Sequence, residues 1–151
     1  MMKHKQAPLK SRKYIACQIY KPYLERILKE EKLCDEVEYV DIEVHNEPQE
    51  LRETLQERID ANQDKDEIVL LYGICGNAAE GLRSEKSELI LFRVHDCLAV
   101  LLGSNKRYQE MIEVHKTGQW KCEGNYSVYL QRYGRQYYEY VRQYGEDNAR
   151  Y

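Results

Sequence analysis

Apolar residues in this chain form short runs that alternate with stretches of helical periodicity. Residues 68–71 are a continuous apolar run, typical of a strand covered on both faces. A second run, interrupted by Arg93, occupies 89–94, and further strands are expected at 13–20, ending at or shortly after Cys17, and at 37–45. Between them, apolar residues recur every three to four positions, which indicates helices.

The helices are expected to follow each strand in turn. Pro22 suits the first turn of the first helix, and the next helix begins near Pro48 and presents one apolar face, formed by Leu51, Leu55 and Ile59. Shorter helices are expected at 77–82, 98–102 and 108–115, the second of them capped by Asp96. The last helix is rich in tyrosine, and Gly134 is expected to kink or break it.

Strands that alternate with helices through short connections predict an α/β fold. We expect a three-layer sandwich with a mainly parallel, flavodoxin- or Rossmann-like sheet of about four strands, in the spatial order 2-1-3-4. A charged arm over residues 1–12 precedes a single α/β domain over 13–151, whose carboxyl-terminal part is the tyrosine-rich helix.

Cysteine and histidine residues follow the ends of three predicted strands. Cys17 ends the first strand, Cys75 follows the third, and His95 and Cys97 follow the fourth. Ligands bind at the carboxyl ends of such strands, and adjacent strands lie about 4.8 Å apart, so these side chains can converge. Three thiols and an imidazole suit tetrahedral zinc, with His95 as the fourth ligand or as an acid/base group. Packing as a small buried residue explains Cys17 equally well.

Two further features could contribute to a cofactor site. Gly73, Gly76 and Asn77 form a glycine-rich turn before a predicted helix, where backbone N–H groups attract anions. Their spacing matches neither a dinucleotide fingerprint nor a P-loop, so a small anion or the edge of a larger cofactor is expected. His45 follows the second strand. A lone histidine before a turn is more often structural, so we place it around the cofactor and not among the metal ligands.

Composition narrows the functional classes. The 26 acidic and 23 basic side chains leave a net charge of -3, which argues against nucleic-acid binding driven by bulk charge. The basic amino terminus lacks the apolar core of a signal peptide, and no apolar run approaches the ~18 residues of a membrane helix. We therefore expect a cytoplasmic protein without a membrane partner. In the cytoplasm, five cysteines without a CxxC pair favour metal or redox chemistry over disulfides.

Tyrosine dominates the aromatic residues, with 14 tyrosines against one phenylalanine and one tryptophan. Most of those after residue 125 recur three to four positions apart, which places them on one helical face: Tyr126, Tyr129, Tyr133, Tyr137, Tyr140 and Tyr144. Such a face is more often packing or a subunit contact than a binding box. We expect a homodimer through this helix.

Several stretches also match a family pattern. They include Ile15-Ala-Cys17, His45-Asn-x-Pro48, Tyr72-Gly-Ile-Cys-Gly-Asn77, and His95-Asp-Cys-x-x-x-Leu-Leu-Gly-Ser104. Together they resemble an uncharacterised family of anaerobic bacteria and archaea, a domain of unknown function, over roughly residues 14–108. Its members are often encoded beside corrinoid-dependent methyltransferases and their corrinoid proteins. The resemblance implies that Cys17, Cys75, His95 and Cys97 act together, and that a corrinoid protein or a methyltransferase is a partner.

The chain departs from that family at two places. Gln18 stands where relatives carry glycine, and the loop over 118–124 differs. Relatives also continue into a further strand-helix-strand, so the sheet is expected to be shorter here or completed by a partner.

These observations leave three hypotheses for function. The leading one is a metal-thiolate protein, with zinc as the metal, that serves corrinoid or one-carbon methyl metabolism. The alternative is a non-enzymatic module that binds a corrinoid or an anion, and a partner protein. A third is an iron–sulfur protein, since three or four cysteines can hold a cluster. The residues do not specify a reaction.

Overall fold

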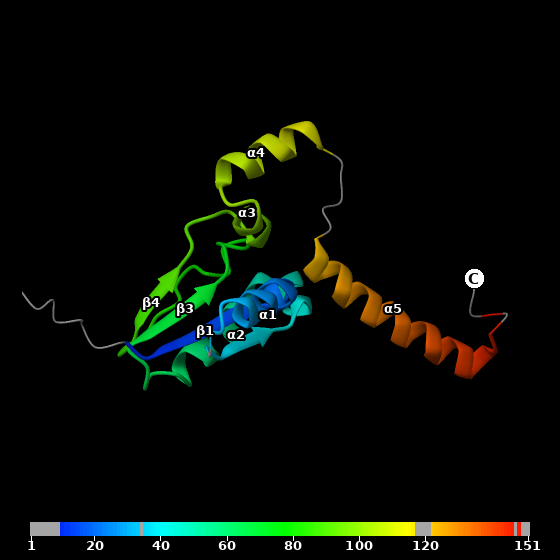
Figure 1. The fold of residues 1–151 in the computed structure, drawn as a ribbon, viewed down its shortest axis with the longest axis horizontal. Coiled ribbons are helices and arrows are strands. Elements are labelled where there is room, and N and C mark those ends of the chain that lie inside the picture. The colour runs from blue at the N-terminus through cyan, green and yellow to red at the C-terminus, as the bar shows by residue number, and fades with distance from the viewer. Residues whose placement is uncertain (1–9, 34, 117–121, 147, 149–151) are drawn as a thin grey trace, which may run out of the picture.

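The computed structural model describes residues 10–33, 35–116, 122–146 and 148. Its four strands form one all-parallel sheet in the order β2-β1-β3-β4 (Figure 1), which confirms the predicted fold class and strand order. The strands are β1 (Arg12–Cys17), β2 (Val37–Val40), β3 (Glu67–Leu71) and β4 (Glu88–Leu91). Their register pairs Cys17 with Val40, Ala16 with Leu71, and Leu70 with Leu91, so all four strands end at one edge.

Five α-helices and two short 3₁₀ helices connect and follow the described strands. They are η1 (Gln18–Tyr20), α1 (Lys21–Glu30), η2 (Ile42–Asn46), α2 (Pro48–Asp60), α3 (Cys97–Leu101), α4 (Asn105–Val114) and α5 (Glu123–Tyr144). The chain moves outward from β1 to β2 and back to β3, so right-handed crossovers place α1 and α2 on opposite faces of the sheet. Proline occupies the first turn of both helices, as predicted.

The core lies around the two central strands. Ile15 and Ala16 of β1 are fully buried, as are Ile68 and Leu70 of β3. These strands are apolar without alternation because helices cover both faces of the parallel sheet. One face of α2 completes the core with the three predicted residues, Leu51, Leu55 and Ile59.

Four predicted elements differ from those of the structure. The second strand ends at Val40, because the Asp41 carboxylate accepts the N–H of Glu43 at 2.9 Å and turns the chain into η2. The helix predicted at 77–82 is wrong, since turns occupy residues 75–81. The break predicted at Gly134 is also wrong, because α5 continues through it. The first strand begins at Arg12, one residue earlier than expected. Residues 1–9 of the predicted arm, and 118–121 of the divergent loop, lie outside the described residues.

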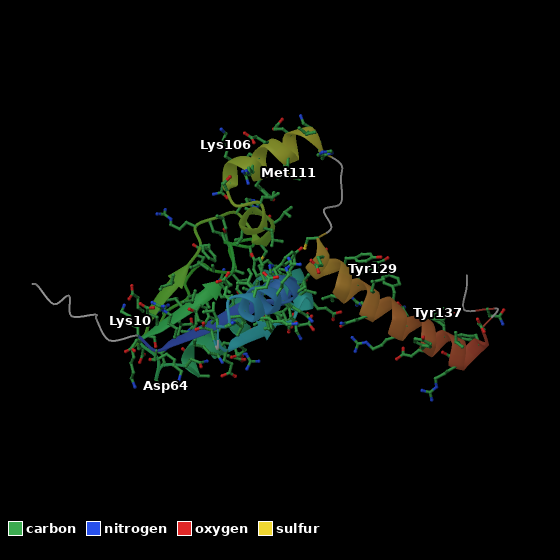
Figure 2. All side chains as sticks on the ribbon, in the orientation of Figure 1. Lys10, Asp64, Lys106, Met111, Tyr129 and Tyr137 are labelled. Carbon is green, nitrogen blue, oxygen red and sulfur yellow. The ribbon has the colours of Figure 1, made fainter. Side chains whose placement is uncertain are left out.

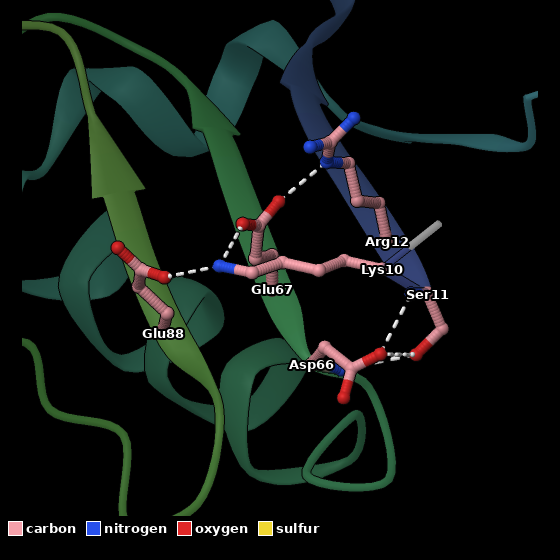
Figure 3. A network of polar contacts seen from close by, with 6 residues as sticks. All are labelled: Lys10, Ser11, Arg12, Asp66, Glu67 and Glu88. Atoms are coloured by element: carbon pink, nitrogen blue, oxygen red, sulfur yellow. Dashed lines mark hydrogen bonds and ion pairs between the residues drawn. The ribbon is translucent and has the colours of Figure 1, made fainter. Parts of the chain in front are cut away.

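A polar network fastens the amino ends of three strands (Figure 3). Glu67 is only 5% exposed, and its carboxylate pairs with Lys10 at 2.6 Å and with Arg12. Lys10 also reaches Glu88 at 2.9 Å, while the Asp66 carboxylate accepts the Ser11 N–H at 2.7 Å and the Ser11 hydroxyl at 2.8 Å; together the network joins β1, β3 and β4. It therefore supports the register that aligns the opposite, carboxyl edge.

Replacing Glu67 by glutamine is expected to lower the thermal stability at neutral pH and to have less effect in acid. Hydrogen bonds from Lys10 and then Arg12 hold the pKa of Glu67 below its ordinary value. The stabilisation is therefore present above the ordinary glutamate pKa and is lost as the pH falls through the lowered pKa. Melting curves of both proteins between neutral pH and pH ~3 test this, with Glu88→Gln as a more exposed control. An equal difference at every pH would contradict it.

Candidate metal centre

The ends of the four strands bring together four side chains of the kinds that bind metals, three cysteines and one histidine. Cys17 ends β1, His45 lies in η2 after β2, Cys75 follows β3, and Cys97 begins α3 after β4. The Cys75 and Cys97 Sγ atoms lie 3.7 Å apart, and Cys17 Sγ lies 3.7 Å from His45 Nδ1. The donor atoms of His45, Cys75 and Cys97 all lie within 4.8 Å of one another. The three cysteines are free and buried, so the cluster is a compact, largely dry set of soft ligands.

The backbone around Cys75 is built for close approach. Beyond the strands, the Ile74 N–H donates to the Val94 carbonyl at 2.9 Å, and the Cys75 N–H donates to the His95 carbonyl at 3.0 Å. Gly73 lies so near this neighbouring loop that a Cβ would come 2.6 Å from the Cα of Asp96. Any larger residue there would push the Cys75 and Cys97 loops apart.

Cys75 itself has a φ of 46°, in the left-handed region that non-glycine residues seldom adopt. Gly76 and Asn77 follow with φ of 64° and 67°. Three consecutive left-handed residues cannot begin an α-helix, which explains the turns that replace the predicted one. Strained backbone of this kind concentrates at functional sites.

Two side chains from the segment after β1 tie the loops together. The Tyr20 hydroxyl donates to the backbone carbonyl of Cys97 at 3.1 Å. The Gln18 side-chain amide oxygen, Oε1, accepts the N–H of Ile42, at the start of η2, at 3.3 Å. The Asp96 carboxylate caps α3 by accepting the Ala99 N–H at 3.0 Å, as predicted. These contacts position Cys97 and His45 relative to Cys17, and the sequence did not indicate the roles of Tyr20 and Gln18.

The three cysteines of the cluster shift one another's pKa values. Hydrogen bonds from Cys17 and then Cys75 lower the pKa of Cys97, and His45 and Tyr20 contribute in the same direction. The same hydrogen bonds to Cys97, together with burial, raise the pKa of Cys17 and of Cys75. The pKa of Cys97 thus moves in the opposite direction from those of Cys17 and Cys75 because the three thiols contact one another.

The structure places the two histidines differently from the sequence prediction, which had His95 as a metal ligand and His45 near the cofactor. The His95 side chain is 61% exposed, its Nδ1 lies 3.0 Å from the Asp96 carboxylate, and its ring stacks on Tyr108 with centroids 4.9 Å apart. It therefore lies outside the thiol cluster, which was not the expected position for a metal ligand. His45, expected only near the cofactor, supplies the imidazole. The predicted strand order could have identified His45, because it places the end of the second strand beside Cys17.

Tyr72 covers the imidazole from the buried side. Its ring stacks on that of His45, with centroids 5.9 Å apart and 21° between the planes. The side chain is 1% exposed, and its hydroxyl has no hydrogen-bond partner among the described residues. Burial, and then the nearby Cys17, Cys97 and Cys75, raise the pKa of Tyr72. An unpaired hydroxyl beside the thiols is costly unless another group at the site accepts its hydrogen bond.

The predicted anion site at the glycine-rich turn loses its structural basis. Gly76 and Asn77 lie on the turn next to Cys75, but no helix begins there to offer its first N–H groups. The Asn77 carbonyl accepts from Arg52 Nη2 at 2.8 Å, which ties the turn to α2. Gly73, as shown above, serves close packing. The structure therefore gives these three residues roles in shaping the Cys75 loop.

Comparison with known proteins places the chain in a family. Residues 39–151 match a family model described as a protein of unknown function, DUF1638. The chain belongs to this family. The matched region contains His45, Cys75 and Cys97 and begins after Cys17. No curated protein and no solved structure matches the chain. Among the described helices, none combines the length and apolar character needed to span a bilayer.

Proposed function

We propose that this DUF1638 member is a metal-thiolate protein that binds one zinc ion through Cys17, His45, Cys75 and Cys97. The observation that carries the proposal is the convergence of these four side chains, each from a different strand end, at the carboxyl edge of the sheet. Four chain segments far apart in sequence meet there, and packing alone does not require three thiols and an imidazole at one point.

Two of the donor–donor distances fit tetrahedral zinc. With Zn–S near 2.3 Å and Zn–N near 2.0–2.1 Å, a tetrahedral site separates two sulfurs by about 3.8 Å and a sulfur and a nitrogen by about 3.5 Å. The 3.7 Å separations of Cys75 Sγ from Cys97 Sγ, and of Cys17 Sγ from His45 Nδ1, agree with both values. Soft thiolates with one imidazole are the ligand set that zinc prefers over hard cations.

The chain's own groups define what the site can do. His45, Cys75 and Cys97 form the mutually close set, so Cys17 is the ligand that an external thiol would displace. Tyr72 offers the one hydroxyl near the thiols that lacks a partner among the described residues, and it can donate to a ligand held there. When bound, zinc would supply Lewis acidity that favours the thiolate form of such a thiol. His95, exposed beside Asp96, is available for proton transfer only outside the cluster.

The physiological setting that we propose is one-carbon methyl metabolism. The family resemblance of the Tyr72–Asn77 and His95–Ser104 motifs supports this, because it points to corrinoid-dependent methyltransferases as neighbours. Thiols activated at zinc are suitable methyl acceptors, and this joins the site's chemistry to that setting. Buried reduced cysteines also need a reducing compartment, which is consistent with the cytoplasm.

Metal content tests the proposal. The protein is purified without oxygen and without a histidine tag, and its metals are measured by elemental analysis. We expect about one zinc per chain, and loss of that zinc in Cys75→Ser and Cys97→Ser. Cys122→Ser is the matched control, because Cys122 caps α5 and lies outside the cluster. Wild-type protein without metal, or equal zinc in all three variants, would contradict the proposal.

The same preparation distinguishes the alternatives. A brown protein that contains iron and sulfide would replace zinc by an iron–sulfur cluster at these cysteines. A spectral shift of added corrinoid that persists after zinc chelation would favour a corrinoid-binding module instead.

A further inference from the structure

Helix α5 presents an apolar stripe that nothing in the described chain covers. Most of its stripe residues are tyrosines, and they are 37–52% exposed: Tyr126, Leu130, Tyr133, Tyr137, Tyr140 and Tyr144. Figure 1 shows α5 extending away from the sheet, and Tyr137 lies on the extended part (Figure 2). Monomeric proteins seldom leave so large an apolar face in water.

Among the described residues, the contacts that hold α5 against the body of the protein lie in the first half of the helix. Gly124 approaches η1 so closely that a Cβ would overlap the backbone carbonyl of Ile19. The Glu123 N–H donates to the Tyr23 hydroxyl at 3.0 Å, and Arg132 pairs with Glu43 at 2.9 Å. Beyond Arg132 the stripe continues for three further turns. A helix without tertiary contacts is marginal in water, so this length requires packing of its own.

The stripe has the spacing of a coiled coil. From Tyr126 to Tyr144, its members are separated by four, three, four, three and four residues, which is the alternation of the a and d positions of a heptad. The interval covers almost three heptads and runs through Gly134 without a break. A partner helix can therefore pack along the whole stripe.

The charges around the stripe favour a second copy of the same helix. The flanking e and g positions, where charges select a partner, are all uncharged: Ser127, Tyr129, Gly134, Gln136, Val141 and Gln143. The charged residues of this segment, Arg132, Arg135, Glu139 and Arg142, occupy outer positions. Two identical helices would thus meet without like charges facing each other. The uncharged e and g positions of the stripe give no preference for a partner of opposite charge.

The area is sufficient for a dimer. A buried aromatic residue contributes about 150–250 Å², so burying the exposed half of five tyrosines and a leucine removes about 500–600 Å² from each copy. A pair then buries over about 1,000 Å², the lower limit of specific interfaces. We propose that this protein is a homodimer in which the tyrosine stripe of α5 packs against α5 of a second copy.

Sedimentation equilibrium of the full-length protein, from about 1 to 100 μM, tests this proposal. We expect a mass of twice 18.1 kDa in the upper part of this range. Tyr137→Glu places a charge in the stripe and is expected to weaken the dimer about 30-fold or more, as loss of an interface anchor does. Tyr138→Glu is the matched control. Tyr138 is next to Tyr137 in the sequence, but its side chain is 69% exposed and lies off the stripe.

Each outcome decides the proposal. Retained helical circular dichroism in Tyr137→Glu shows that any monomer is folded, and Tyr133→Glu repeats the test at a second stripe position. A wild-type monomer at about 100 μM would overturn the proposal. So would a dimer that survives both stripe variants, or one that Tyr138→Glu weakens equally. The readout is mass, so it does not depend on whether the thiol cluster binds zinc.

Discussion

Replacing His45 by alanine is expected to lower the zinc affinity about 100-fold or more, whereas replacing His95 is expected to leave it unchanged. Structural zinc binds with about 10–16 kcal/mol in small domains, and one of four ligands carries a substantial share of that free energy. His45 Nδ1 lies 3.7 Å from Cys17 Sγ, while the His95 side chain is mostly exposed and pairs with Asp96. Competition against a chromophoric chelator measures both variants.

The two variants distinguish His45 from His95 as the histidine that binds the metal. Spacing in sequence favoured His95, because it directly precedes Asp96 and Cys97. Strand order and distance favour His45. Loss of zinc on replacing His95, with His45→Ala retaining it, would contradict the geometry described above. Equal loss in both would indicate a metal held through a rearranged loop after β4.

Removing the metal is expected to lower the melting temperature by about 5–10 °C. A ligand that binds only the folded protein, at about 100 times its dissociation constant, adds about 2.7 kcal/mol. For a domain of this size, each kcal/mol corresponds to about 2–4 °C. The effect is expected to be large here because the four ligands come from four strand ends, so one ion would hold together loops that otherwise meet through few hydrogen bonds.

Calorimetry with and without a strong chelator measures this change, and readdition of zinc should reverse it. His95→Ala is expected to show the same drop as the wild type. His45→Ala is expected to melt low and to respond little to the chelator. A melting temperature that the chelator leaves unchanged in the wild type would mean that the cluster is stable as thiols alone.

The pattern of apolar residues predicted the sheet because it reflects burial directly. The run over 68–71 is apolar without alternation, and Ile68 and Leu70 are fully buried in the centre of the sheet. Strand order followed from short crossovers of one hand. From that order, the meeting of Cys17, Cys75 and Cys97 could be predicted without any motif, since parallel strands end at one edge.

Which histidine joins the three thiols depended on details that periodicity does not show. Whether His45 reaches the thiols is decided by the η2 turn, which the Asp41 side chain starts and the Gln18 side chain supports. The left-handed run from Cys75 to Asn77 was equally hidden, because Cys75 adopts a conformation that its residue type disfavours. Such local conflicts with propensity are expected at functional sites.

X-ray absorption at the zinc edge, on protein purified with its native metal, tests the central claim most directly. We expect three sulfur ligands near 2.3 Å and one nitrogen near 2.0–2.1 Å, with the nitrogen lost in His45→Ala and retained in His95→Ala. If an external thiol takes the place of Cys17, the spectrum still shows three sulfur ligands. In that case the Cys17→Ser variant gives the same spectrum as the wild type. A first shell of oxygen and nitrogen alone, or no zinc at all, would contradict a metal-thiolate centre at the ends of these strands.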